Sequence, residues 1–236
     1  MHPARLVNGL LDALQPQALH GRDQVVCHVW SGGVVKPLTG DRLARGSAAY
    51  AAALQAAGVG RDEVVLIALP HSEALLYSFF GAMTAGCVPS FIPPPTPKQD
   101  PALYWSSHRQ LFERLGSGAI VTWRDNVDDL RRCLRGLPIQ VFLSEDIDID
   151  RENAPALPAL ARATSDVACL QHSSGTTGLK KGVALTFDAI DQQIDAYAAA
   201  IGLGATDCIV SWLPLYHDMG LIACLLLPFV RRTPIV

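Results

Sequence analysis

Hydrophobic and polar positions follow two different periods along the chain, and short β-rich runs separate longer helical stretches. Apolar residues that recur every three to four positions predict helices over residues 41–57, 72–85, 99–115, 125–135, 187–201 and 218–229. Short apolar runs predict strands over residues 25–29, 64–69, 87–92, 119–122, 140–143, 167–171 and 208–212. Because strands alternate with helices, the pattern favours an α/β fold with a parallel-rich sheet that helices cover on both faces.

Local signals support the expected boundaries. Ser72 is a candidate N-cap, and Gly58 and Gly86 follow the ends of two predicted helices. The acidic and Pro/Ala-rich stretch 144–165 is the best candidate for an internal linker, which would join sub-segments 1–143 and 166–236. With 236 residues, half of them hydrophobic, the chain is long enough to bury a large core.

Composition narrows the class of protein. The net charge is −3 and the basic residues are scattered, so we expect no nucleic-acid partner. The six cysteines lie singly in apolar surroundings, which is typical of buried free thiols in a reducing cytoplasm. The N-terminus lacks a signal-peptide pattern, and the apolar run 219–230 is shorter than the roughly 20 residues that cross a bilayer. We therefore expect a cytoplasmic protein without a membrane span.

One segment carries an unusual concentration of ligand-binding chemistry, the run Gln-His-Ser-Ser-Gly-Thr-Thr-Gly-Leu-Lys-Lys-Gly-Val at residues 171–183. Its glycines let backbone N–H groups approach an anion, and its hydroxyl side chains add donors. Lys180 or Lys181 supplies a mobile positive charge. The run predicts a loop that binds phosphate, and the alternative is a solvated Ser/Gly linker.

Two common nucleotide-binding loops do not fit this run. In a Walker-type loop counted from Gly175, Lys180 would occupy the position of the second glycine. The spacing of Gly175, Gly178 and Gly182 also differs from the dinucleotide pattern G-x-G-x-x-G.

The run instead resembles the phosphate loop of the acyl-adenylate-forming ligases, which include acyl-CoA synthetases, luciferases and nonribosomal adenylation domains. That loop reads Thr/Ser-Ser-Gly-Thr/Ser-Thr-Gly-x-Pro-Lys-Gly-Val, and Lys181 takes the place of its lysine. The chain departs from the pattern at His172, where an aromatic residue is common, and at Lys180, which replaces the proline. The resemblance implies that ATP phosphates bind to Ser173, Ser174, Gly175, Thr176, Thr177, Gly178 and Lys181. It also implies Mg²⁺ bound to the phosphates, with Thr176 or Thr177 nearby.

A second motif follows the loop, Ser-Trp-Leu-Pro-Leu-Tyr-His-Asp-Met-Gly-Leu-Ile at residues 211–222. It looks most like the fatty acyl-AMP ligases and the related acyl-loading modules of polyketide and lipopeptide assembly lines. That likeness implies that His217 is a catalytic residue beside the reacting carboxylate, together with Lys181. The residues by themselves also fit a capped helix with Asp218 in its first turn. Trp212, Tyr216 and Met219 fit walls of an acyl site or ordinary core positions.

Weaker motifs extend the resemblance over roughly residues 20–236, although only the two later motifs are specific. The implied fold is the layered αβα arrangement of the ligase N-terminal domain. Residues 1–236 would then be a partial AMP-binding domain, without the later subdomain and the lysine-bearing C-terminal domain. We expect an exposed apolar edge and self-association through it.

The implied function is ATP-dependent activation of a carboxylic acid, with a fatty acid favoured, as acyl-AMP with release of pyrophosphate. The acyl group would pass to a thiol on an acyl carrier protein or coenzyme A. Two other hypotheses remain. One is a catalytically incomplete module that binds acyl or nucleotide groups or serves as an interaction module, and the other is an unrelated kinase or NTPase. A ligase forms AMP and pyrophosphate only when an acid is present, whereas an NTPase forms ADP.

Overall fold

The computed structural model describes residues 9–19, 23–31, 33–96, 98–151, 156–172 and 182–236. Its central element is a parallel sheet of four strands in the order β4-β3-β5-β6. The strands are β3 (Val64–Ile67), β4 (Val88–Phe91), β5 (Ala119–Thr122) and β6 (Gln140–Leu143). All residues of β4 and β5 are buried, as expected for parallel strands covered on both faces. The expected α/β fold is confirmed.

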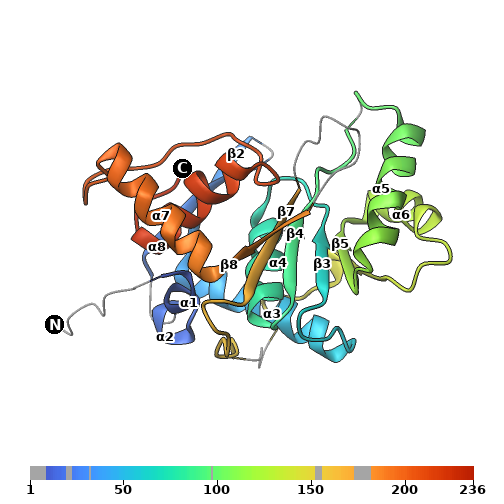
Figure 1. Cartoon of the computed structure of the whole chain (residues 1–236), viewed down its shortest axis with the longest axis horizontal. Coiled ribbons are helices and arrows are strands. Elements are labelled where there is room, and N and C mark those ends of the chain that lie inside the picture. The colour runs from blue at the N-terminus through green and yellow to red at the C-terminus, as the bar shows by residue number, and fades with distance from the viewer. Residues whose placement is uncertain (1–8, 20–22, 32, 97, 152–155, 173–181) are drawn as a thin grey trace.

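Helices connect these strands and cover the sheet (Figure 1). They are α3 (Gly40–Ala56), α4 (Glu73–Thr84), α5 (Pro101–Leu115) and α6 (Val127–Cys133), with single turns η1 (Arg124–Asn126) and η2 (Ser144–Asp146). Ser72 caps α4 by accepting a hydrogen bond from the Leu75 N–H, as predicted. Helices α3 and α4 approach closely at Gly81, where a Cβ atom would lie 2.6 Å from the Cβ of Tyr50.

Two antiparallel strand pairs accompany the sheet, β1 (Val25–Ser31) with β2 (Val34–Thr39), and β7 (Val167–His172) with β8 (Gly182–Thr186). Strand β7 lies beside β4 in Figure 1. The chain continues into α7 (Phe187–Ile201), a π-helical stretch η3 (Met219–Leu226) and α8 (Leu227–Arg231). The N-terminal part forms α1 (Leu10–Ala13) and α2 (Pro16–Leu19).

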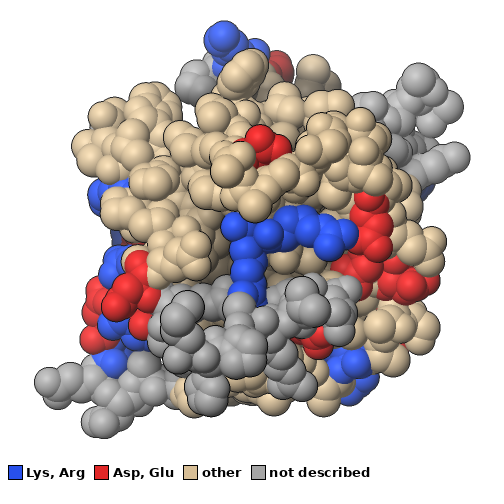
Figure 2. Space-filling view, turned by 90° about the vertical axis from the view of Figure 1, so that its left-hand side faces the viewer, with Lys and Arg blue, Asp and Glu red and all other residues tan. Residues whose placement is uncertain are grey.

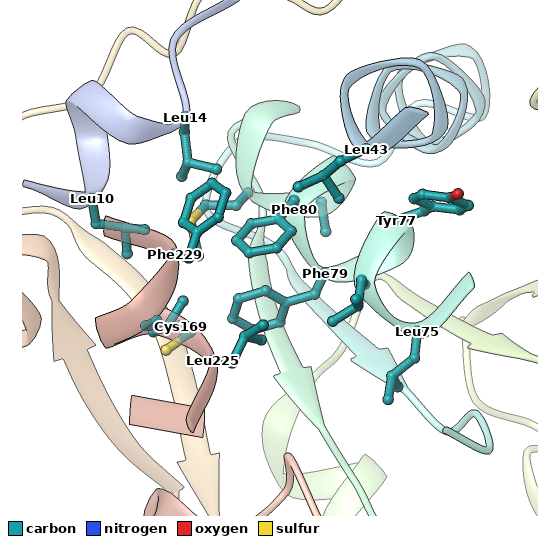
Figure 3. Close-up of a cluster of buried hydrophobic side chains, with 14 of the residues drawn as sticks. Leu10, Leu14, Leu43, Leu75, Tyr77, Phe79, Phe80, Cys169, Leu225 and Phe229 are labelled. Atoms are coloured by element: carbon teal, nitrogen blue, oxygen red, sulfur yellow. The ribbon is translucent and has the colours of Figure 1, made fainter. Parts of the chain in front are cut away.

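Two hydrophobic clusters pack the layers, a large one shown in part in Figure 3 and a smaller one between the sheet and helices α5 and α6. Phe80 of α4 stacks on Phe229 of α8 with ring centroids 4.8 Å apart, and Phe79 stacks on Phe91 of β4 at 4.6 Å. The predicted linker 144–165 contributes to the large cluster, because both Leu157 and Leu160 are buried in it. The described part of this segment therefore packs against the protein.

The sequence pattern missed two strands. Strand β2 is mostly exposed and contains Pro37, and a proline lowers the expectation of a strand. Strand β8 begins with Gly182 directly after the loop motif, and its first three residues are exposed. The sequence of neither strand therefore shows the clear alternation of apolar and polar residues that predicts a half-buried strand.

Two predicted elements were wrong in form. Residues 208–212 make only an isolated bridge, between Ile209 and Ile235, and Pro234 has no N–H to extend a ladder. The helix expected at 218–229 is present and runs without a break to Arg231, but its first part, η3, is π-helical and only its last part, α8, is α-helical. Pro228 lies in the first turn of α8, where its missing N–H costs least.

The cysteines follow the prediction in part. Four are buried, and burial raises the pKa of the Cys169 thiol to about 12 and that of Cys87 to about 11. Cys208 is exposed and Cys224 is partly buried, so the expectation that all six are buried was wrong. Cys208 precedes the isolated bridge at Ile209, and Cys224 lies in η3.

On the face shown in Figure 2, most of the upper part is uncharged, and the charged side chains lie mainly at the two sides and across the middle. Among the described helices, none is both long and apolar enough to cross a bilayer.

The N-terminal helix α1 is attached to α7 through one carboxylate. Oδ1 of Asp191 accepts a hydrogen bond of 2.8 Å from the backbone N–H of Leu10. Burial raises the pKa of Asp191, as do the nearby carboxylates of Asp195 and Asp188, while the Leu10 N–H and Arg231 lower it. The net direction is upward, so the folded protein favours the protonated carboxyl.

We expect Asp191→Asn to stabilise the protein progressively, relative to wild type, as the pH rises above the ordinary Asp pKa of about 4. In wild type the unfolded carboxyl ionises first, so the free energy of unfolding falls until the pH exceeds the raised folded pKa. Asn keeps an acceptor for the Leu10 N–H and removes this titration. The gain should stay below about 1 kcal/mol, because solvent screens a partly exposed group.

Urea unfolding at several pH values between about 4 and 7.5 measures this effect. Asp207→Asn is the matched control, because Asp207 is exposed and also accepts a backbone N–H, from Gly204 at 2.7 Å. A stability difference between Asp191→Asn and wild type that does not change with pH would contradict the prediction.

Candidate functional site

The predicted phosphate loop connects two neighbouring strands. Ser173, Ser174, Gly175, Thr176, Thr177, Gly178 and Lys181 lie outside the described residues. The residues on either side are described, and His172 at the end of β7 is the antiparallel partner of Gly182 at the start of β8. The structure thus places the two residues between which the predicted loop lies in the sequence.

The buried serine Ser90 of β4 holds the loop end of β7 against the parallel sheet. Its hydroxyl donates to the carbonyl of Leu170 at 3.0 Å and lies 2.9 Å from Nε2 of His172. Ser90 is fully buried, so both contacts are shielded from water. His172, which departs from the aromatic residue of the family pattern, thus has a structural contact of its own.

On its other side, β7 is linked to the segment that carries His217. The Gln171 side-chain amide donates to the carbonyl of Tyr216 at 3.1 Å, although the two residues are 45 positions apart in the sequence. The His217 N–H donates to the carbonyl of Pro214 at 3.1 Å, and the His217 carbonyl accepts from the Leu221 N–H at 2.9 Å. The backbone on both sides of His217 is therefore fixed, while its imidazole is exposed.

These parts surround one cleft of about 510 Å³. Three elements line it, the β7–β8 hairpin, helix α7 and the start of η3. The lining residues are Gln171, His172, Val183, Leu185, Gln193, Tyr197, His217, Asp218, Met219 and Ile222. The structure therefore brings His217 to the same cleft as the residues that flank the loop on either side.

The start of η3 depends on a close backbone contact. A Cβ atom at Gly220 would lie 2.3 Å from the carbonyl oxygen of Pro214, which belongs to the backbone and cannot swing away. Asp218 caps η3, because its Oδ1 accepts from the Met219 N–H at 2.8 Å. The motif at 211–222 therefore both begins a capped helix and lines the cleft.

The three residues suggested as acyl walls divide between two clefts. Met219 lines the cleft with His217. Trp212 and Tyr216 line a second, mainly apolar cleft of about 820 Å³ beside the β1–β2 hairpin. Trp212 is 89% exposed, so it is not a core residue.

Sequence reasoning missed three polar residues of the cleft, namely Gln171, Gln193 and Tyr197. Gln171 is the first residue of the run 171–183, and that place was the available signal, although the sequence assigned it no role. Gln193 and Tyr197 lie four positions apart on α7, a spacing that places both on one face of the helix. No motif distinguishes them from ordinary helix residues.

The described residues contain no group of three or more His, Cys, Asp or Glu side chains that could hold a metal ion. Thr176 and Thr177, the residues suggested for Mg²⁺, lie outside the described residues. In nucleotide sites Mg²⁺ is held largely by phosphate oxygens and water, so a protein cage is not required.

Comparison with known proteins shows which family this chain belongs to. The family model described as AMP-binding enzyme matches residues 15–236, which is nearly the whole chain. The chain belongs to the AMP-binding enzyme family. The resemblance seen in the two motifs is thus confirmed.

Related AMP-binding enzymes differ in the acid they use. The chain is 30% identical to sulfoacetate–CoA ligase from Cupriavidus necator over 84% of this chain and 39% of that protein. It is 28% identical to long-chain-fatty-acid–AMP ligase FadD26 from Mycobacterium tuberculosis, over 85% of this chain and 34% of that one.

The structural comparison supports the same family. A crystal structure of fatty acyl-adenylate ligase from L. pneumophila, in complex with acyl adenylate and pyrophosphate, matches with a TM-score of 0.84 and 25% identity. The match covers 100% of this chain and 40% of that one. The α/β fold is therefore that of the N-terminal domain of these ligases, and the chain spans about two fifths of such a protein.

We expect Gly220→Ala to disturb the cleft, because the added methyl group meets the Pro214 backbone and one of the two segments must shift. Strain of this kind typically costs about 1–3 kcal/mol. Chemical denaturation measures the loss. Gly204→Ala is the control, because a Cβ there lies 3.6 Å from the nearest atom, of Asp207. Equal stability of the two variants would show that the Gly220 contact is not restrictive.

Proposed function

We propose that this chain binds ATP and a carboxylic acid and activates the acid as acyl-AMP with release of pyrophosphate. The observation that carries the proposal is the single cleft, which His217 shares with the residues on both sides of the predicted phosphate loop. Membership of the AMP-binding enzyme family supports it. A cleft between a phosphate loop and a histidine segment suits a reaction that brings two anions together.

In the proposed reaction the acid's carboxylate attacks the α-phosphorus of ATP, and the bond to pyrophosphate breaks. The amides and hydroxyls of Ser173–Gly178 would hold the phosphates, and the Lys181 ammonium would offset the charge of the departing pyrophosphate. Thr176 and Thr177 are the proposed neighbours of Mg²⁺, which would bind phosphate oxygens and screen their charge. His217 would lie beside the carboxylate.

We further propose a fatty acid as the substrate. Val183, Leu185, Met219 and Ile222 give the cleft apolar surface along which a hydrocarbon chain can lie. Fatty-acid ligases are named among both the sequence relatives and the structural neighbours. The acyl acceptor would be the thiol of a carrier protein or of coenzyme A.

Acid-dependent exchange of labelled pyrophosphate into ATP tests the proposal. The panel of acids runs from acetate to palmitate and includes sulfoacetate and coumarate. We expect exchange with the longer fatty acids. Exchange with a short or aromatic acid alone would overturn the fatty-acid assignment. Absence of exchange with every acid, together with retained nucleotide or acyl binding, would favour a binding module. ATP hydrolysis to ADP without acid would indicate an NTPase.

Two substitutions separate the proposed roles. Lys181→Ala should lower the exchange rate about tenfold or more with the fold intact, because it removes a charge-assisted contact to phosphate. Lys180→Ala is its control. His217→Ala should raise the KM for the acid more than the KM for ATP. Its control is His71→Ala, a histidine of the second cleft.

Unchanged exchange in Lys181→Ala would remove this lysine from the site. A rise in the KM for ATP alone in His217→Ala would assign His217 to the nucleotide pocket.

A further inference from the structure

Residue Gln171 joins the strand that leads into the phosphate loop to the backbone beside His217. Its side-chain Nε2 donates to the Tyr216 carbonyl at 3.1 Å. This carbonyl belongs to the peptide group whose N–H is that of His217, and that N–H donates to Pro214 at 3.1 Å. The Tyr216–His217 peptide is thus held at both of its polar ends, on one end by Gln171.

We propose that Gln171 is a positioning residue, which sets the place of His217 relative to the end of strand β7. The role of His217 at the carboxylate rests on the function proposed above. The side-chain contact itself does not depend on that function. Gln171 would act through His217 and would not itself touch the reacting atoms.

The position of Gln171 on β7 makes this link specific. On one side, Ser90 fixes the neighbouring Leu170 carbonyl to β4 at 3.0 Å. On the other side, only His172 separates Gln171 from the start of the predicted loop at Ser173. A shift at the end of β7 would therefore also shift the backbone beside His217.

The chemistry of the contact requires an amide at this position. The Tyr216 carbonyl can only accept, so the NH₂ group of Gln171 must face it. The Oε1 atom of Gln171 is buried and has no hydrogen-bond partner among the described residues. A glutamate would keep an acceptor in place of Oε1 but would turn a carboxylate oxygen toward the Tyr216 carbonyl. Glutamate and methionine therefore both remove the link, although only glutamate keeps the acceptor.

The test compares Gln171→Met and Gln171→Glu with Gln140→Met. Gln140 lies outside the cleft, and its side-chain Nε2 likewise donates to a distant backbone carbonyl, that of Ala57 at 3.0 Å. In acid-dependent ATP–pyrophosphate exchange, both Gln171 variants should raise the KM for the acid roughly threefold to tenfold, the effect of losing one hydrogen bond. The KM for ATP should change little in both variants, the thermal midpoint should change little in Gln171→Met, and Gln140→Met should leave the exchange parameters near wild type.

A second readout needs no activity. In the ligand-free protein with labelled histidine, the His217 imidazole signal, assigned with His217→Ala, should move in both Gln171 variants. It should stay in place in Gln140→Met. An unmoved signal in Gln171→Met would overturn the inference. So would a wild-type KM for the acid in Gln171→Glu beside a raised KM in Gln171→Met, because the acceptor rather than the donor would then matter.

The two proposals fail separately. If wild-type protein exchanges no pyrophosphate with any acid while the His217 signal moves as expected, the ligase function fails and the positioning link stands. If exchange is active but neither the signal nor the KM for the acid responds to Gln171, the function stands and the link fails.

Discussion

The placement of strand β7 is the constraint on which the candidate site depends. The strand meets β4 through the buried Ser90 hydroxyl and pairs with β8 along its length. Its last residues lead into the predicted phosphate loop and also contact the His217 segment. A neutral hydrogen bond contributes only about 1 kcal/mol, so these few bonds specify position more than they supply stability. Stability comes from the apolar side chains beneath them, such as Ala168 and Cys169, which are fully buried.

The sequence predicted most of the fold because the buried elements carry strong periodic patterns. Strands β3, β4, β5 and β6 are short apolar runs between amphipathic helices, and such alternation leaves few other architectures. Strands β2 and β8 were missed because they are largely exposed, so they lack that pattern. The π-helical form of residues 219–226 was also missed, because a 3.6-residue apolar period does not distinguish a π-helix from an α-helix.

From the sequence, candidate site residues could be predicted only within the two short motifs. The loop and His217 were predicted from residue types at characteristic spacing, and the structure adds that residues flanking the loop share one cleft with His217. Gln171, Gln193 and Tyr197 could not be assigned from the sequence, because a glutamine or tyrosine on a strand or helix has no distinctive spacing. Their contribution arises from contacts between segments far apart in the chain.

The core continues through residues 157 and 160, within the stretch whose composition suggested a linker. Packing of this kind couples the two flanking parts energetically, so neither is expected to unfold alone at equilibrium. Substitutions far from the cleft, at Leu157 for example, would then lower the amount of folded protein and mimic a catalytic defect. In a mutational survey of this chain, loss of activity therefore identifies a chemical role only after correction for the folded fraction.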